Sequence, residues 1–188
     1  DVHILAGSFI GNSATLSIGN ESAIGTGFSS VAGKYILATP TNDENTNELS
    51  GIWWLVPGEP NTPSLQLPEL NNGWIYEGWV VINEMPVSTG KFSETDMADM
   101  SARYSATLPA PEFPGEDFLR NPPAGLTFPT DLSGEKAVIS VEPDPDNSED
   151  PFTIKPLTGD IPMNAVDHTL YNMTDNTGSI NVSGEVTR

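Results

Sequence analysis

The sequence predicts an all-β protein, folded as an antiparallel β-sandwich of immunoglobulin-like or similar type. Glycine and proline number 17 each in 188 residues, and they interrupt the chain too often for long helices. Apolar residues make up 37% of the chain and recur in short runs such as Ile52–Val56, as expected of many short strands. The final segment, Gly178–Val186, alternates in polarity like a half-buried strand. A closed barrel is the alternative architecture.

The expected strands follow one another with turn-forming residues between them. Gly11-Asn12 separates the first two strands, and the polar run Pro40–Glu48 separates the next two, because such side chains compete for backbone hydrogen bonds. Asn83–Pro86 is the turn of a third hairpin. Strands are expected at 2–9, 13–18, 34–39, 51–56, 64–67, 74–82, 87–92, 136–142, 152–157, 169–173 and 178–186.

At most one short helix is expected, over residues 93–104. Ser93 would be its N-cap, with acidic residues in the first turn. Met97, Met100 and Tyr104 would then share one face of the helix.

The next segment, 105–135, is expected to be an irregular, proline-rich loop over the surface. Six prolines between Pro109 and Pro129 leave too few backbone donors for a continuous ladder. We therefore expect one sandwich domain over residues 1–162 that includes this loop, with residues 163–188 as a C-terminal strand extension.

The charge of the chain excludes several classes of partner. The net charge is -19, from 26 acidic and 7 basic residues. Nucleic acid and anionic membrane surfaces both require a basic footprint, which is absent. The absence of cysteine excludes disulfides and thiolate chemistry. No apolar run approaches the ~20 residues of a membrane span, so we expect no direct membrane insertion of this segment. Protein is the expected partner.

One family resemblance can be stated. The strand–turn–strand segment Tyr76–Phe92, read with Ala137–Asp146 and Pro151–Gly159, resembles the extracytoplasmic domain of the anti-sigma-K factor family. The likeness is strongest over residues 74–92 and 136–160, and the sigma-binding and transmembrane parts of that family have no counterpart in this sequence. The resemblance implies a non-enzymatic, extracytoplasmic β-domain that acts through protein–protein contact, in the periplasm, on the cell surface or after secretion.

The residues that carry this resemblance are assigned structural roles. Trp79 is expected to pack between sheets, beside a glycine that permits close approach of a neighbouring backbone. Gly90 is expected at a bulge or bend, and Glu142-Pro143 at the end of a buried strand. The signature residues are Tyr76, Gly78, Trp79, Gly90, Phe92, Glu142 and Pro143.

We predict no catalytic residue. The two histidines, His3 and His168, follow no nucleophile-elbow motif. Among many acidic residues, Glu77 is the one candidate for a glycosidase-type carboxylate, because it lies in a strand beside tryptophans. In Trp53-Trp54 the rings must point to opposite faces of a strand, so one can enter the core and the other must be covered or exposed for contact.

A cofactor is not required, but one turn has the oxygen density that calcium prefers. Asp144, Asp146, Glu149 and Asp150 crowd this turn, although their spacing does not fit an EF-hand. A solvated turn without metal is the alternative. Asn20, Asn172 and Asn181 begin tripeptides that fit the N-glycan acceptor pattern.

A second functional hypothesis comes from the two ends of the sequence. His3–Gly7 is similar to Lys155–Gly159, so the chain begins with a copy of an internal strand. This echo favours a secreted structural subunit of a filament or surface layer, in which copies of the chain exchange terminal strands. The residues expected to make these contacts are His3, Leu5, Ile180, Val182 and Val186.

Overall fold

The computed structural model describes residues 2–180 and 182–188, and strands dominate it. The strands are β1 (Ser13–Ser17), β2 (Lys34–Leu37), β3 (Gly51–Trp53), β4 (Leu55–Val56), β5 (Thr62–Pro63), β6 (Trp74–Ile82), β7 (Met85–Phe92), β8 (Gly115–Asp117), β9 (Lys136–Pro143), β10 (Leu157–Asp160), β11 (Tyr171–Asn172), β12 (Thr174–Asp175) and β13 (Ser183–Thr187). Two single-turn 3₁₀ helices, η1 (Glu48–Ser50) and η2 (Thr177–Ser179), accompany them.

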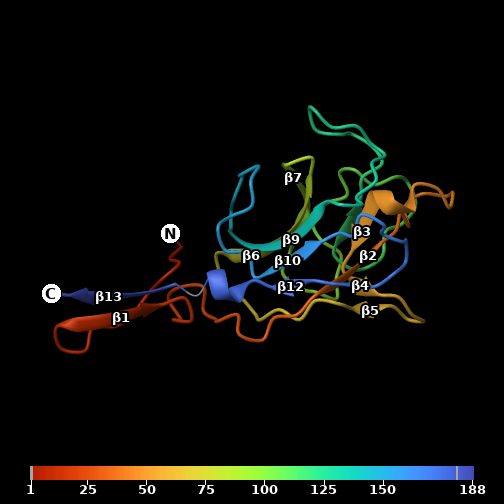
Figure 1. The fold of residues 1–188 in the computed structure, drawn as a ribbon. Helices are drawn as coiled ribbons and strands as arrows, with labels where there is room; N and C mark the ends of the chain where they lie inside the picture. Colours follow the sequence, from red (N-terminus) through yellow and green to blue (C-terminus); the bar gives the residue numbers. More distant parts are fainter. Residues whose placement is uncertain (1, 181) are drawn as a thin grey trace.

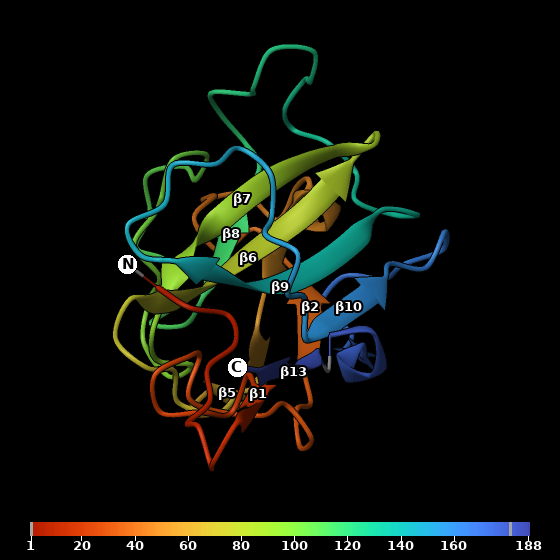
Figure 2. The same cartoon turned by 90° about the vertical axis from the view of Figure 1, so that its left-hand side faces the viewer.

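Two antiparallel sheets form the body of the molecule. One has the strand order β12-β10-β9-β6-β7, and the other has the order β11-β2-β3-β8. Figure 2 shows β7, β6, β9 and β10 side by side in the first sheet. No sheet closes on itself among the described residues, so the predicted all-β sandwich is confirmed and the barrel is not formed.

The main hydrophobic core lies between the facing sides of the two sheets. On β6 and β9, the directly paired residues Tyr76 and Val141 point into it, as do the paired residues Val80 and Ala137, four positions further along each strand. The second sheet contributes Tyr35 and Leu37 from β2 and Ile52 from β3, and Trp54 enters the core directly after β3. Burial of these side chains is the main stabilising contribution to the fold.

The hairpin of β6 and β7 forms where the sequence predicts it. Its tight turn is Asn83-Glu84, and both residues have positive φ (50° and 66°), as a type I′ turn requires. The pairing shifts from Gly78 with Gly90 to Trp79 with Ser88, so Thr89 is the extra residue of a β-bulge. The predicted irregularity at Gly90 is therefore confirmed.

Trp79 is buried, but it does not lie between the sheets, and that expectation was wrong. Trp79 pairs with Val138 on the face of β6 and β9 that points away from the main core. Gly78 takes the core-facing position because the ring of Trp54 needs the space: a Cβ at Gly78 would lie 2.7 Å from that ring. On the outer face, Trp79 Nε1 donates a hydrogen bond to Ser140 Oγ over 2.9 Å.

Both rings of the Trp53-Trp54 pair are covered. Trp54 is fully buried in the main core. Trp53 points to the opposite face, packs with Phe113 of the proline-rich loop, and donates from Nε1 to Asp117 Oδ1 over 2.8 Å. An exposed tryptophan for partner contact is therefore not present at this position.

Residues 93–104, where at most one short helix was expected, form no helix. Met97 and Met100 are exposed, at 60% and 71%, so no shared apolar face is buried. Backbone donors of the segment are satisfied elsewhere: Met100 N bonds to Lys91 O, and Tyr104 N bonds to the buried Glu116 carboxylate. These long-range bonds replace the weak local preference for a helical turn.

Three further segments expected as strands form few backbone pairs. Residues 2–9 contribute a bridge from Ala6, and 64–67 contribute backbone bonds at Ser64 and Gln66. Of the expected strand 152–157, Ile154 O accepts one bond from Val141 N, and Leu157 is the first residue of β10. After residue 162, β11 pairs with β2 and β12 pairs with β10, so part of the C-terminal segment completes both sheets. The last strand, β13, pairs instead with β1 outside the body.

Candidate functional site

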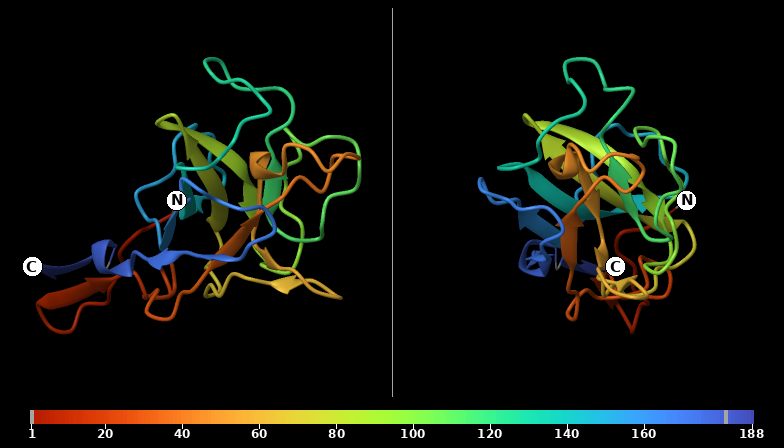
Figure 3. Two further views of the ribbon diagram at one scale, coloured as in Figure 1. Left: turned by 45° about the vertical axis from the view of Figure 1, so that its right-hand side comes forward. Right: turned by 90° about the vertical axis from the view of Figure 1, so that its right-hand side faces the viewer.

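The feature of this molecule that most clearly invites a partner is a ribbon made from its two terminal segments. β1 and β13 pair in register from Ser13 with Thr187 to Ser17 with Ser183. Figures 1 and 3 show this pair extending away from the two sheets. Ala6 and Ile10 add backbone pairs along the other edge of β1. We call residues 6–17 and 182–188 the terminal ribbon.

β13 has a free edge among the residues that the structure describes. Arg188 N donates to Asn12 O over 3.0 Å, so the backbone at Arg188 faces β1. Because backbone donors alternate along a strand, Val186 and Gly184 also face β1, whereas the N–H groups of Glu185 and Thr187 point outward. This edge can accept another strand.

Several apolar side chains of the terminal ribbon are poorly covered by other residues. Ile10 is 88% exposed, and Phe9, Val182 and Val186 are each a little under half exposed. Residues 6–17 contain no Asp, Glu, Lys or Arg, and 182–188 contain one charge of each sign, Glu185 and Arg188. The terminal ribbon is therefore electrically neutral in a chain of net charge -19.

An apolar hollow of about 370 Å³ lies where the terminal ribbon joins the body. We call it the root hollow; it is lined by Ile4, Leu5, Thr153, Ile154, Ile180 and Val182. Three of the residues predicted to make partner contacts, Leu5, Ile180 and Val182, thus meet at one place. Val186 lies further out, on β13, and the exposed His3 borders a different depression, beside Glu21.

The residues of the predicted calcium turn do not gather around one point. Asp144, Glu149 and Asp150 are exposed. Asp146 instead approaches Glu77 and Glu142, on the outer face of the five-stranded sheet. The sequence does not predict this cluster, because Glu77 and Glu142 are 65 positions apart. From sequence, Glu77 is a candidate carboxylate, Glu142 a strand-end residue and Asp146 part of the calcium turn.

The surroundings of Glu77 change its acidity. Its side chain is almost fully buried, and this burial raises the pKa of the carboxyl to about 7, against opposing contributions from the Ser88 hydroxyl and the Lys91 ammonium. Burial likewise raises the pKa of Glu142. A raised carboxyl pKa is typical of functional sites and of buried structural acids alike.

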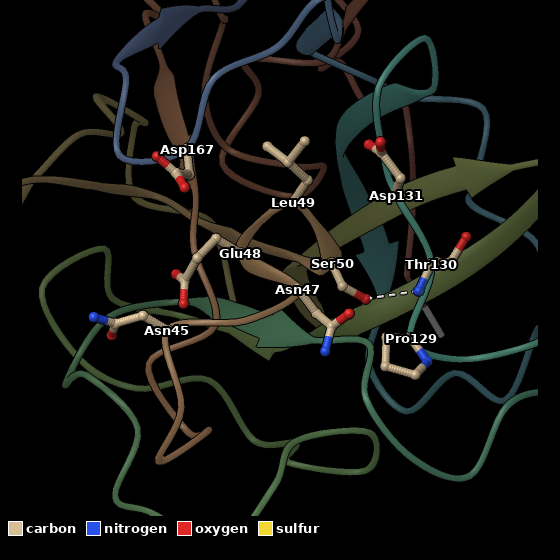
Figure 4. A pocket seen from close by; sticks show the side chains of 9 residues that line it. All are labelled: Asn45, Asn47, Glu48, Leu49, Ser50, Pro129, Thr130, Asp131 and Asp167. Carbon is tan, nitrogen blue, oxygen red and sulfur yellow. Dashed lines mark hydrogen bonds between the residues drawn. The ribbon is translucent and has the colours of Figure 1, made fainter.

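A second depression, shown in Figure 4, contains acidic side chains but no reactive arrangement. The Ser50 hydroxyl donates to Phe118 O and accepts from Thr130 N, so its hydrogen bonds hold the proline-rich loop. The Glu48 carboxylate accepts from Thr39, and His168 lies 3.9 Å from it. The imidazole is therefore next to a carboxylate that stabilises a loop, and among the described residues no side-chain hydroxyl is hydrogen-bonded to it.

The three predicted glycan acceptors lie in different surroundings. Asn20 is half-buried, and its side-chain oxygen accepts from Ser22 N over 2.9 Å. Asn172 is exposed on β11. Asn181 lies outside the described residues. Glycosylation at these positions stays a prediction.

Comparison with known proteins does not assign the chain to a family. No protein-family model matches it, and searches of curated proteins and of solved structures found no significant match. The resemblance to anti-sigma-K factors therefore stays a prediction. Within the described residues, no helix has the length and apolar character needed to cross a membrane.

Proposed function

We propose that this chain is a non-enzymatic, extracytoplasmic structural module that binds other protein molecules, and that its principal partner is a second copy of itself. The observation that carries this proposal is the terminal ribbon, with its free β13 edge and its exposed apolar side chains. The extracytoplasmic location is inferred from the resemblance of residues 74–92 and 136–160 to the outer domain of anti-sigma-K factors.

The first supporting argument is the marginal stability of the terminal ribbon on its own. Two or three strands without a packed second layer gain little hydrophobic burial, and such ribbons are barely stable in water. Pairing with another strand would satisfy the outward N–H groups of Glu185 and Thr187 and would bury the apolar side chains beside them. Strand addition of this kind is a common mode of protein recognition.

The second argument is electrostatic. Two copies of a chain with net charge -19 repel each other over most approaches. The terminal ribbon is neutral, so contact through it brings together the least repelling surfaces of the two molecules. A partner rich in lysine or arginine would be expected to use the acidic body instead.

The third argument is that the ribbon and its root are different, complementary surfaces. The ribbon carries Ile10 near its tip, 88% exposed, and the root hollow offers an apolar cavity of about 370 Å³. When two different patches of identical molecules bind each other, each bound copy still has one free patch, so further copies can add and a filament can form. The proposed contact is the ribbon of one copy against the root hollow of the next.

The test uses Glu185→Pro, which removes one outward N–H of β13 and leaves the inward bonds to β1 in place. Proline is tolerated on such an edge. The control is Glu185→Gln, which removes the same charge but keeps the N–H. Size-exclusion chromatography with light scattering, followed by negative-stain imaging, should show concentration-dependent assembly for the wild type and for Glu185→Gln, and a folded monomer for Glu185→Pro.

A side-chain pair tests the apolar part of the contact. Val186→Asp places a charge on the ribbon, whereas Val166→Asp makes the same change at a residue of the body that is 58% exposed. We expect Val186→Asp alone to abolish assembly. A wild type that stays monomeric at millimolar concentration, or equal assembly by both aspartate variants, would contradict the proposal.

A further inference from the structure

Three carboxylates converge on the outer face of the five-stranded sheet. Glu77 lies on β6, Glu142 on the neighbouring β9, and Asp146 in the loop that follows β9. One oxygen atom from each lies within 4.8 Å of the other two. Glu77 and Glu142 are 5% and 1% exposed, so this is a buried group and differs from the solvated acids over the rest of the surface.

Hydrogen bonds orient the carboxylates on β6 and β9 through one oxygen each. Glu77 Oε1 accepts a hydrogen bond from the Ser88 hydroxyl on β7. Glu142 Oε1 accepts from the Ser140 hydroxyl and from Phe152 N, the latter over 2.8 Å. Rotation of both carboxylates is thereby restricted, as is usual for ligands whose supporting groups hold them in place for an ion.

The second carboxyl oxygen of each of the three residues receives no hydrogen bond. In Asp146, as in the two glutamates, one oxygen is bonded: Oδ1 accepts from Ser148 N over 3.0 Å. Glu77 Oε2, Glu142 Oε2 and Asp146 Oδ2 are buried and receive no hydrogen bond. An unsatisfied buried carboxylate oxygen is costly, and three such groups in one cluster are stabilised when a cation or protons bind between them.

The lysines nearby do not supply enough positive charge. Lys91 Nζ lies 4.0 Å from Glu77 Oε2 and 3.6 Å from Asp146 Oδ2, and it donates to the main-chain oxygen of Asp146 over 2.8 Å. The ammonium of Lys155 donates its hydrogen bonds to two main-chain oxygens and to none of the three carboxylates. Lys91 therefore approaches two of the three carboxylates, and among the described residues no ammonium lies within 4.0 Å of Glu142.

We propose that Glu77, Glu142 and Asp146 bind one divalent cation, with Ca²⁺ preferred to Mg²⁺. All the ligand atoms are oxygens, which suits a hard cation. Oxygens that lie within 4.8 Å of one another can share one ion at calcium–oxygen distances of about 2.4 Å. Ca²⁺ accepts irregular coordination by protein oxygens, whereas Mg²⁺ demands near-ideal octahedral geometry and keeps several waters. Water would complete the coordination. This site is separate from the terminal ribbon, and its proposal does not depend on the proposed function.

The cation would have a route to the site. A hollow of about 520 Å³ is bordered by Glu77 together with Ser148, Glu149 and Asp150. Glu149 and Asp150 are exposed acids at this surface, and their charges raise the local concentration of cations. Two residues of the predicted calcium turn thus lie along the approach to the ion and not against it.

The experiment uses the full chain after treatment with a chelator, at about pH 8, because protons compete with a cation for carboxylate oxygens. Isothermal titration with Ca²⁺ should give a stoichiometry of one. At a hundredfold excess over Kd, bound Ca²⁺ should raise the melting temperature by roughly 5 °C or more. Mg²⁺ should bind at least about tenfold more weakly.

Terbium provides a readout of position. Trp79 Nε1 donates to Ser140 Oγ, and that hydroxyl donates to Glu142, so two hydrogen bonds connect one indole to a proposed ligand of the ion. Excitation of tryptophan should therefore sensitise Tb³⁺ luminescence, Ca²⁺ should quench it by displacement, and Trp79→Phe should remove most of it.

The decisive variant is Glu142→Gln. Its Oε1 still accepts the hydrogen bonds of Ser140 and Phe152, so the fold should be kept, while one ligand oxygen becomes an amide nitrogen. Affinity for Ca²⁺ should fall at least about tenfold. Asp146→Asn should do the same from a loop position, and the exposed control Glu149→Gln should change affinity less than about twofold.

Three outcomes would overturn the proposal. Titration could show no saturable binding up to millimolar Ca²⁺. Binding could be weak and multiple, and unaffected by Glu142→Gln and Asp146→Asn, which would mean adventitious association with surface acids. Glu142→Gln could raise the melting temperature while the wild type binds no ion, which would mean that protons alone occupy the cluster.

Discussion

The buried acids of this protein predict that it becomes more stable as the pH falls from neutrality. Asp99 gives the cleanest case, because it lies apart from the proposed cation site. Its two carboxyl oxygens accept from Gly115 N over 2.8 Å and from Ser101 N over 2.9 Å. Burial nevertheless raises the pKa of Asp99 to about 7, and the charge of Glu116 adds to this effect.

The sign follows from proton binding. Between the ordinary pKa of 3.8 and the folded-state value of about 7, the folded protein holds a proton at Asp99 that the unfolded chain has released. The free energy of unfolding therefore falls as the pH rises through this interval. The full difference corresponds to about 4 kcal/mol, and solvent screening at this half-buried position reduces it to about 2 kcal/mol.

The assay is urea denaturation with a chelator present, at about pH 5 and about pH 8, for the wild type and Asp99→Asn. Wild-type stability should be higher at the lower pH. The variant loses one acceptor and about 1 kcal/mol at low pH, but its stability should depend less on pH, because the group no longer titrates. Equal slopes for the two proteins, or a wild type that gains stability toward about pH 8, would refute the reasoning.

Two further predictions concern packing and buried hydrogen bonds. Gly78→Ala should destabilise the protein by about 3 kcal/mol in thermal unfolding, because the new Cβ would lie 2.7 Å from the Trp54 ring, whereas Gly27→Ala, with no atom within 4 Å, should be close to neutral. Trp53→Phe should cost about 2 kcal/mol more than Trp54→Phe, because the first removes the 2.8 Å bond to Asp117 and the second removes an indole nitrogen without a hydrogen-bond partner. Equal costs for the two tryptophan variants would show that the Asp117 bond contributes nothing.

The parts of the fold that were predictable from sequence are those set by local pattern. The hairpin of β6 and β7 combines alternating apolar residues with Asn83, a residue that tolerates positive φ. The side of the sheet that Trp79 faces was not predictable, because strand alternation defines two faces without saying which one is the core. That choice depends on Trp54, which fills the space left at Gly78.

The candidate sites show the same limit. Local density of acidic residues led to Asp144, Asp146, Glu149 and Asp150 as one group, yet the structure combines only Asp146 with distant carboxylates. The register that sets Ile75 opposite Glu142, and hence Glu142 near Glu77, arises between strands far apart in sequence. The register between two strands that are not joined by a short turn cannot be predicted from one sequence.

The terminal segments were predicted to form strands that contact other copies of the chain, and the structure bears on the placement of their residues. Leu5, Ile180 and Val182 do meet, at the root hollow. The pairing of β1 with β13 in one molecule was not foreseen, since nothing in either segment specifies its partner.

Sedimentation velocity over a wide range of protein concentration tests the self-association through the terminal ribbon most directly. Wild-type chain should shift to faster species as concentration rises, while Glu185→Pro sediments as a monomer throughout. A single slow species for the wild type at every concentration would show that the ribbon does not join copies of this protein.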